Sequence, residues 1–291
     1  MRILLIAPHQ DDEILAAGGL IQKCIKHGDD FLVLFATNGD YHGFDIAEKR
    51  YYESEQALAS LGLAKESIFY LGYGDTGMKP SHSFLKRMQF KKNDTLLTSL
   101  VSCTTYHPAG KKTVHAMRTG NESFLTKINF LSDLNWFLVH YSPDIIIVSD
   151  SSDRHGDHAA LIGLLQNTNA FHQIPICLTY IIHGGNDALW PSRNTQKFTR
   201  PPVCNSKMWG ERISISLTKQ EQEHKYNATL SFATQLKDDL ENFLILSLSK
   251  KKFFSCLEII LTHKKYIAIL NIGRIYKIVI TSQKGRNVFL I

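Results

Sequence analysis

The sequence predicts an α/β fold with a Rossmann-like three-layer α/β/α arrangement and a mostly parallel sheet. Short aliphatic runs alternate with helical patterns through the first two thirds of the 291 residues. Such alternation calls for parallel strands joined by right-handed crossovers. In addition, side chains suited to metal chemistry follow two of these runs, at the strand ends where open α/β sheets usually bind ligands.

The first predicted unit is a strand, a turn and a helix. Residues 2–7 (RILLIA) have the length and composition of a buried parallel strand. Apolar residues then recur at helical spacing up to Gly28, where the helix is expected to end. The turn between strand and helix carries His9, Asp11, Asp12 and Glu13.

An imidazole and neighbouring carboxylates can hold a divalent metal while leaving a coordination position for water. A nearby carboxylate that is not a ligand can then accept the proton of that water. Acidic residues also stabilise the first turn of a helix through its macrodipole, without any metal. That simpler interpretation accounts for Glu13 and one of the two aspartates. From this cluster alone, a metal site and helix capping remain equally open.

Further elements follow in order along the chain. We expect strands over 31–36, 67–72, 144–149 and 176–182, and helices over 44–61, 124–138 and around 160–165. Within 44–61, we interpret Arg50 and Glu53 as an ion pair on a solvated helix face, since residues three apart are neighbours there. Thr218 and Glu221 form a capping box that opens a predicted helix reaching about Ser247.

The stretch 78–121 is basic and shows little periodicity. A lid or substrate loop and a solvated surface excursion are equally compatible with it. We expect His107 and His115 in this stretch to be surface histidines rather than metal ligands.

A second polar cluster follows the predicted strand 144–149. It reads SDSSDRHGDHAA and contains Asp150, Asp153, His155, Asp157 and His158. Two strand ends that each carry His and Asp can face one crevice, which favours a shared site over capping.

These two clusters together resemble the signature of the PIG-L/LmbE-like zinc-dependent N-deacetylases. The family pattern is a strand followed by A-H-P-D-D-E, with a later H-x-D-H. Here the first motif reads APHQDDE over 7–13, and the second reads HGDH over 155–158. Pro8 precedes His9, and Gln10 stands where the family has proline. The resemblance covers roughly 1–245 and implies the Rossmann-like fold.

The resemblance also implies roles for individual residues. His9, Asp12 and His158 would hold one Zn²⁺, and Asp11 would be the general base. His155 would stabilise the oxyanion or donate a proton to the leaving amine, and Asp157 would orient an imidazole.

Two further positions resemble elements that border the family's substrate cleft. Tyr106 belongs to a threonine–tyrosine element, and His183 begins an HGG that follows a strand. We expect both to contact substrate. The implied reaction is hydrolysis of an N-acetyl group from an amino sugar. An amidase acting on a thiol–sugar conjugate, and a non-catalytic carbohydrate- or nucleotide-binding module, are the alternatives.

Composition excludes several other classes of protein. The hydrophobic content of 44% and the net charge of +6 indicate a globular, mildly basic protein. We expect a glycan or small-molecule substrate and no nucleic acid, because no arginine-rich run is interleaved with aromatics. No apolar run is long enough to predict a membrane span. The 5 cysteines have no CxxC spacing, which favours reduced, mostly buried thiols and a cytoplasmic location. A homo-oligomer remains open.

The sequence lacks motifs for two common chemistries. No G-x-G-x-x-G follows the first strand, which disfavours nicotinamide and flavin cofactors. No G-x-S-x-G elbow is present for serine hydrolysis.

We predict a deacetylase domain over 1–249 and a basic, β-rich tail over 250–291 whose role is unknown. The tail is compatible with strands added to the sheet edge, a small β appendage or a poorly packed end. Contact of this tail with a membrane surface is a further hypothesis.

Overall fold

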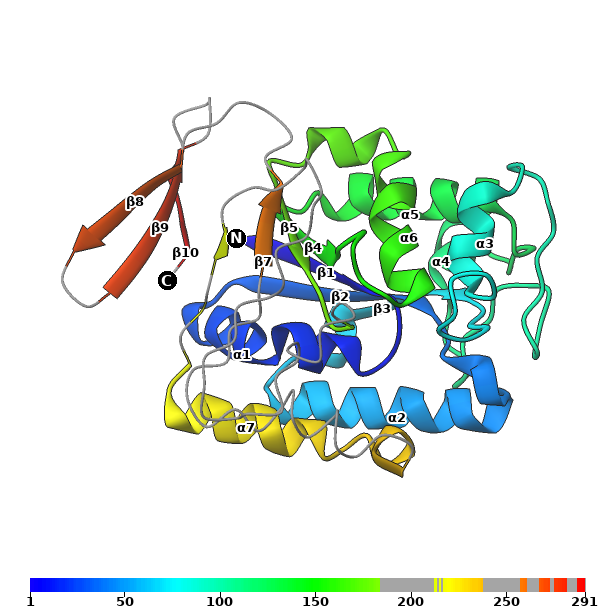
Figure 1. Ribbon diagram of the computed structural model, residues 1–291, viewed down its shortest axis with the longest axis horizontal. Coiled ribbons are helices and arrows are strands. Elements are labelled where there is room, and N and C mark those ends of the chain that lie inside the picture. The colour runs from blue at the N-terminus through cyan, green and yellow to red at the C-terminus, as the bar shows by residue number, and fades with distance from the viewer. Residues whose placement is uncertain are drawn as a thin grey trace.

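The computed structural model describes residues 1–183, 212–213, 215 and 217–237, together with the backbone of four strands beyond residue 256. Its centre is a parallel sheet in the order β3–β2–β1–β4–β5 (Figure 1). These strands are β1 (Arg2–Ala7), β2 (Asp30–Thr37), β3 (Ile68–Tyr73), β4 (Ile145–Ser149) and β5 (Ile176–Tyr180). The predicted fold class is confirmed.

Helices cover both faces of the sheet. One face carries α1 (Asp12–His27), α2 (Phe44–Ser60) and α7 (Lys219–Thr229), drawn below the sheet in Figure 1. The other face carries α3 (Phe84–Phe90), α4 (Val114–Thr119), α5 (Lys127–Tyr141) and α6 (Gly156–Gln166). Short 3₁₀ turns are η1 (Asp40–His42), η2 (Lys65–Ser67) and η3 (Ala170–Gln173).

Alternation along the buried strands divides the apolar interior into two cores. Ile3 and Leu5 of β1 pack in the core that contains α1 and α2. Leu4 and Ile6 pack in the opposite core, with α5 and α6. A strand buried on both faces must be apolar at every position, which is why 2–7 is an unbroken aliphatic run rather than an alternating one.

The strand order creates a switch point beside β1. The chain runs from β1 outward through β2 to β3, and then returns to β4 on the other side of β1. In open α/β sheets the crevice for ligands lies outside the carboxyl ends of the strands at such a reversal. Both predicted polar clusters follow these two strands, β1 and β4, so the topology brings them together.

Additional strands extend this architecture. β7 (Leu257–Ile260) pairs antiparallel with β5, and β6 (Arg212–Ile213) pairs antiparallel with β7. A separate antiparallel sheet contains β8 (Ile267–Ile272), β9 (Ile275–Thr281) and β10 (Asn287–Leu290). Within the predicted tail over 250–291, β7 is a strand added to the main sheet beside β5, and β8, β9 and β10 form a small β appendage. The domain boundary at 249/250 stays a prediction.

The helix predicted from Thr218 to about Ser247 is confirmed at its start and wrong in its length. Thr218 and Glu221 make the reciprocal hydrogen bonds of a capping box. However, α7 ends at Thr229, and the chain turns so that the backbone and hydroxyl of Thr234 donate to the carboxylate of Glu53 at 2.8 and 2.5 Å. That tertiary contact ends the helix earlier than the apolar spacing suggested. Residues 238–247 lie outside the described residues.

The histidines of the basic stretch are buried, so their expected surface position is wrong. His107 is 6% exposed, and its ring contacts the rings of Tyr51 and Tyr70 edge-on. His115 is 9% exposed, and its Nδ1 lies 2.9 Å from Asp133. The stretch carries α3 and α4, whose apolar sides pack in the core, and the sequence lacked the periodicity to indicate this.

Cysteine burial follows the expectation in part. Cys24 and Cys177 are buried and unpaired, whereas Cys103 is exposed; the other two cysteines lie outside the described residues. Across the described part of the chain, every helix is too short or too polar to span a membrane.

Candidate active site

The turn after β1 places its polar residues at the carboxyl end of the sheet. His9, Asp11 and Asp12 are all at most 8% exposed. Asp11 precedes the first residue of α1 and has a φ of 129°, a conformation that residues other than glycine rarely adopt. Strained backbone of this kind persists where surrounding contacts enforce it, and it is concentrated at functional sites.

Glu13 accepts hydrogen bonds from donors at the start of α1. Its Oε2 accepts from the backbone of Asp11 at 2.8 Å, and its Oε1 accepts from Ser54 at 2.7 Å. The helix-capping interpretation of the acidic turn therefore holds for Glu13, while the other carboxylates point elsewhere.

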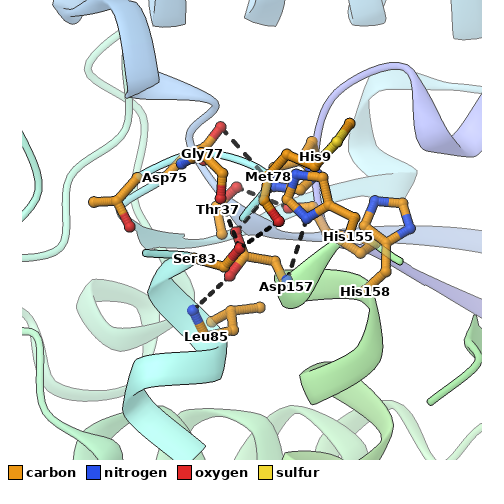
Figure 2. Close-up of polar contacts among 12 residues, drawn as sticks. His9, Thr37, Asp75, Gly77, Met78, Ser83, Leu85, His155, Asp157 and His158 are labelled. Carbon is orange, nitrogen blue, oxygen red and sulfur yellow. Dashed lines mark hydrogen bonds and ion pairs between the residues drawn. The ribbon is translucent and has the colours of Figure 1, made fainter. Parts of the chain in front are cut away.

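The second cluster comes from the connection between β4 and α6. His155 is the N-cap of α6, and His158 lies in its first turn with no exposed surface. Figure 2 draws His155, Asp157 and His158 beside His9, from the other strand end. The ring centroids of His9 and His155 are 4.6 Å apart, and those of His9 and His158 are 5.4 Å apart. The expected meeting of the two clusters is observed.

One carboxylate oxygen links the two strand ends. Oδ2 of Asp12 lies 3.4 Å from Nδ1 of His9 and 3.1 Å from Nε2 of His158. The same oxygen accepts from the backbone N–H of His9 at 2.9 Å, which fixes its position. Two imidazoles thus turn one nitrogen each toward a shared carboxylate.

The opposite nitrogen of each imidazole faces a further carboxylate. Nε2 of His9 lies 3.2 Å from Asp157, and Nδ1 of His158 lies 3.3 Å from Asp153. Carboxylates that hold the outer nitrogen of an imidazole fix its tautomer and orientation, as they do around metal ligands. Asp157 contacts an imidazole as expected. Asp153 was named in the second cluster of the sequence but was given no role there.

The donor set fits a metal ion. Both ring nitrogens of His158 are fully buried without a hydrogen bond of acceptable geometry among the described residues, even though carboxylates lie close. Buried polar atoms without hydrogen bonds are rare and call for an explanation. A nitrogen, an oxygen and a second nitrogen from His9, Asp12 and His158 form a common ligand set for a divalent transition metal.

Other groupings within the same cluster would also offer three ligand atoms. They are His9–His155–His158, Asp12–His158–His183 and His9–Asp75–Asp157, each with its atoms within 4.8 Å of one another. The three predicted ligands are divided between the first two of these sets. The cluster can therefore hold a metal ion, and mutagenesis has to decide which residues bind it.

Charges within the cluster perturb its titration. Burial opposes the charge of Asp12, but the imidazoles of His158 and His9 hold the pKa of that carboxyl well below its usual range. Burial alone would lower the pKa of His9, but the carboxylates around it, Asp75 first, raise it to about 10. The carboxylates of the cluster therefore stabilise positive charge beside Asp12, and a bound cation can supply that charge.

One carboxylate oxygen of Asp11 faces α2, while the charges of His9 and His158 also act on this carboxyl. Its Oδ2 lies 3.4 Å from Nη2 of Arg50, and the same nitrogen donates to the carbonyl oxygen of Gln10 at 2.8 Å. Burial raises the pKa of Asp11 to about 7, with Arg50 opposing the rise. A carboxyl that titrates near neutrality suits a general base.

The interpretation of Arg50 and Glu53 as a solvated ion pair is wrong. Arg50 is 7% exposed and serves the turn of the first motif, whereas Glu53 binds Thr234. The spacing of two residues on a helix does not show which parts of the fold pack against them. Here Arg50 faces the turn of the first motif, and Glu53 faces Thr234.

Two other imidazoles complete the site. The backbone N–H of Asp157 donates to Nδ1 of His155 at 3.2 Å, so Nε2 of that ring carries the proton when it is neutral. Burial, with His9 and His158 nearby, lowers the pKa of His155, which keeps the ring neutral. The ring of His183 lies 5.0 Å from that of His158, at the edge of the cluster.

Tyr106 reaches the site only through other residues. Its hydroxyl donates to Asp40 at 3.1 Å, and Asp40 accepts from the backbone of Asp75 at 2.5 Å. Oδ2 of Asp75 in turn lies 3.9 Å from Nε2 of His9. Asp75 was not predicted from the sequence.

Gln10, which stands where the family has proline, ties the turn to β2 by one side-chain hydrogen bond. Its Nε2 donates to the carbonyl oxygen of Thr37 in β2 at 2.9 Å, and its side chain is fully buried. A Cβ on Gly39 would lie 2.6 Å from Oε1 of Gln10, so the amide packs where only glycine leaves room. The turn is tied to the neighbouring strand, and His9 and Asp12 keep positions in the cluster.

Comparison with known families matches residues 4–167 to PIG-L, described as GlcNAc-PI de-N-acetylase. Among curated proteins, a diacetylchitobiose deacetylase from Thermococcus kodakarensis is 33% identical over 82 residues. That match covers 26% of this chain and 30% of the length of the relative.

Solved structures share the fold. The zinc-inhibited form of teicoplanin deacetylase Orf2 superposes with a TM-score of 0.56 at 13% identity, covering 89% of this chain and 97% of the other. The 4-carboxy-2-hydroxymuconate hydratase from Pseudomonas putida superposes with a TM-score of 0.51 at 11% identity, covering 93% and 99%. Because a deacetylase and a hydratase share this fold, the fold alone does not identify the reaction, and the reaction has to be inferred from the residues of the site.

Proposed function

The chain belongs to the PIG-L family, described as GlcNAc-PI de-N-acetylase, and on that premise we propose that it is a zinc-dependent hydrolase that removes the N-acetyl group from an amino sugar. The observation that carries the proposal is the single oxygen of Asp12 shared by His9 and His158 at 3.4 and 3.1 Å. These three residues are the proposed zinc ligands.

When bound, zinc supplies a Lewis acid that lowers the pKa of a coordinated water to about 7. Asp11 accepts a proton from the attacking water, and the oxygen of that water adds to the amide carbon. A pKa of about 7 leaves a large share of Asp11 deprotonated at neutral pH, which is the form a base requires.

The part of His155 is to bind the oxyanion that forms on the amide oxygen. Because its Nδ1 accepts a backbone hydrogen bond at 3.2 Å, its Nε2–H is the donor available to substrate. A donor fixed before the reaction stabilises developing negative charge at little reorganisation cost. The C–N bond then breaks, the amine takes up the proton that Asp11 accepted, and acetate and a free amino sugar leave.

Asp157 and Asp153 are proposed to hold the two ligand imidazoles in orientation. Tyr106 and His183 are proposed to act on the substrate side, His183 from the edge of the cluster and Tyr106 through its hydrogen bond to Asp40. The family and the donor set support this division of roles.

The test combines metal analysis with acetate release. We expect about one zinc per purified chain, lost in both Asp12→Ala and His158→Ala, and acetate release from N-acetylated amino sugars that depends on that zinc. Arg2→Gln, remote from the cluster at the amino end of β1, serves as the control variant.

Absence of zinc after reconstitution would overturn the proposal and favour a non-catalytic sugar- or nucleotide-binding module. Bound zinc with turnover of a thiol–sugar amide, and none of a simple N-acetyl sugar, would instead favour the amidase alternative.

A further inference from the structure

A group of exposed apolar side chains lies on the face of the fold that carries α3 and α5. Each of these side chains is 50–77% exposed, and together we call them the α3–α5 surface: Phe90, Leu96, Phe124 and Ile128. They come from the end of α3, the segment after it and the chain that enters α5, at one edge of the molecule (Figure 1). Single exposed apolar side chains are ordinary, but a group of them marks an interaction surface.

Backbone hydrogen bonds hold the segments of this surface side by side. The N–H of Leu97 donates to the carbonyl oxygen of Leu125 at 2.9 Å, and the N–H of Ile128 donates to that of Asn93 at 2.9 Å. Leu97 and Leu125 are buried in the core, and the residue before each of them belongs to the exposed set. The exposed side chains therefore come from adjoining stretches of chain.

Lysines connect Phe90 to the rest of the surface. The Nζ of Lys127 donates to the carbonyl oxygens of Gln89 and Lys91, the residues on either side of Phe90. The Nζ of Lys86 lies 5.2 Å from the centre of the Phe90 ring. Lysine side chains lay their stems along apolar surface while the ammonium group stays in water. The apolar side chains are thus bordered by positive charge.

The positive charge of the whole chain is concentrated in this region. Residues 84–129 contain 8 of the 33 lysines and arginines but 2 of the 27 aspartates and glutamates. This excess equals the net charge of +6 of the chain, so the remaining residues carry equal numbers of the two charges. Four lysines lie next to the α3–α5 surface and form no ion pair with a carboxylate of the described residues: Lys86, Lys91, Lys92 and Lys127.

Apolar side chains bordered by unpaired lysines match the surface of an anionic lipid bilayer. Negatively charged headgroups attract the lysines, and apolar side chains that reach between the headgroups leave water. A nucleic acid would neutralise the lysines but leave the apolar side chains exposed. A protein partner needs a complementary shape, whereas a fluid bilayer takes in side chains that protrude separately from different segments.

We propose that the α3–α5 surface docks this protein on anionic membranes, with Phe90 and Phe124 inserted among the headgroups and the lysines against them. The inference does not depend on the proposed reaction, and it concerns the main domain rather than the tail over 250–291. A rigid element connects this surface to the active site, because the N–H of Leu85 at the start of α3 donates to Oδ1 of Asp157 at 2.6 Å. Docking would therefore hold the active site at a fixed distance from the membrane.

The test is co-sedimentation of the full chain with lipid vesicles. One set of vesicles is phosphatidylcholine alone, and the other contains about one third phosphatidylserine, which gives the membrane a negative surface potential. We expect the partition coefficient to be at least about tenfold higher on the anionic vesicles at low salt. The difference between the two sets should shrink at high ionic strength, because salt screens the attraction of the lysines.

Two variants separate the apolar contribution from the charge. Phe90→Ser/Phe124→Ser should lower the partition coefficient on anionic vesicles by at least about tenfold, because two rings no longer leave water. Lys91→Gln/Lys92→Gln should lower it by about tenfold on anionic vesicles and leave partition on phosphatidylcholine unchanged.

Val139→Ser/Leu230→Ser is the matched control. It removes two exposed apolar side chains elsewhere, one near the far end of α5 and one at the end of α7, and it should partition like the wild type. Unfolding midpoints of all variants check that the fold is kept.

Three results would overturn the inference. The first is a wild type that does not bind anionic vesicles or binds both sets equally, and the second is unchanged partition in both surface variants. The third is a dimer in sedimentation velocity that Phe90→Ser/Phe124→Ser abolishes, with no vesicle binding by the wild type, because the surface would then belong to a contact with a second copy of the chain.

Discussion

Nη2 of Arg50 lies 3.4 Å from Oδ2 of Asp11, in the buried space between α1 and α2. The contact joins a helix on one face of the sheet to the turn that carries the first motif. It places a permanent positive charge beside the carboxyl proposed as the general base.

Replacing Arg50 should shift the acidic limb of activity. Arg50 lowers the pKa of Asp11, which burial raises to about 7. Its loss in Arg50→Gln therefore raises that pKa further, and the active, deprotonated form appears only at higher pH. We expect the acidic limb of the kcat/KM profile to move up by roughly one pH unit, so that activity at pH 6 falls about tenfold.

The matched control for this shift is Arg2→Gln, whose partner Asp30 lies on the strand β2 and far from the motif. An acidic limb that stays in place in Arg50→Gln would show that Arg50 does not act on Asp11.

Removing the proposed base should separate catalysis from metal binding. Asp11→Ala leaves His9, Asp12 and His158 intact, so zinc per chain should remain near that of the wild type. The rate of acetate release should fall by about 10²- to 10⁴-fold, the contribution usual for a positioned base. Atomic absorption and an acetate assay on the same sample measure both quantities. Activity like that of the wild type would refute this role for Asp11.

Asp153 should support metal binding without being a ligand. Its Oδ2 faces Nδ1 of His158 at 3.3 Å and also accepts from the backbone of Ile182 at 2.9 Å. Asp153→Asn keeps the shape but weakens the hold on the imidazole. We expect zinc affinity to drop by about 10- to 100-fold, measured by competition with a chelator, with full occupancy restored at high zinc.

Asp150→Asn is the control for that measurement. Asp150 belongs to the same connection, but its carboxylate binds Ser152 and Thr179 instead of an imidazole. An equal loss of affinity in the two variants would indicate a general disturbance of the β4–α6 connection.

Lys225 should make stability depend on pH. It is 2% exposed on α7, its Nζ donates to the carbonyl oxygen of Leu15 at 2.7 Å, and burial lowers its pKa to about 7. In the unfolded chain a lysine titrates near 10.4. Between these two values the unfolded state binds more protons, so stability rises with pH across this window.

Lys225→Met removes that dependence. We expect the variant to gain free energy of unfolding relative to the wild type, and to gain more at pH 7 than at pH 10, measured by urea denaturation at both values. Lys26→Met on the exposed face of α1 is the control and should show no such difference. A gain of the same size at both pH values would contradict the assignment of the titration to Lys225.

The positions of several decisive residues could not be read from the sequence. Arg50 and Glu53 share a helix face by spacing, yet one serves Asp11 and the other binds Thr234. Helical periodicity describes a helix in isolation and carries no information about which neighbours cover it. His107 and His115 were expected at the surface for the same reason, because nothing in their local sequence indicates that aromatic rings and Asp133 enclose them.

The early end of α7 has a similar origin. The apolar spacing continues past Thr229, but the hydrogen bonds from Thr234 to Glu53 hold the chain in another direction. Local propensity is a weak preference, and a tertiary contact overrides it.

By itself, the sequence determined the parallel α/β fold, the main strands and helices of the first 183 residues outside 78–121, and the two motifs of the site. It could do so because a strand buried on both faces must be apolar throughout, and because a motif is local in the chain. Only the tertiary structure decided that Asp12 is shared by two imidazoles, that Asp153 faces His158, and that Arg50 lies beside Asp11. Those relationships join residues from separate elements, and they exist only once the strand order brings the ends of β1, β2 and β4 to one side of the sheet.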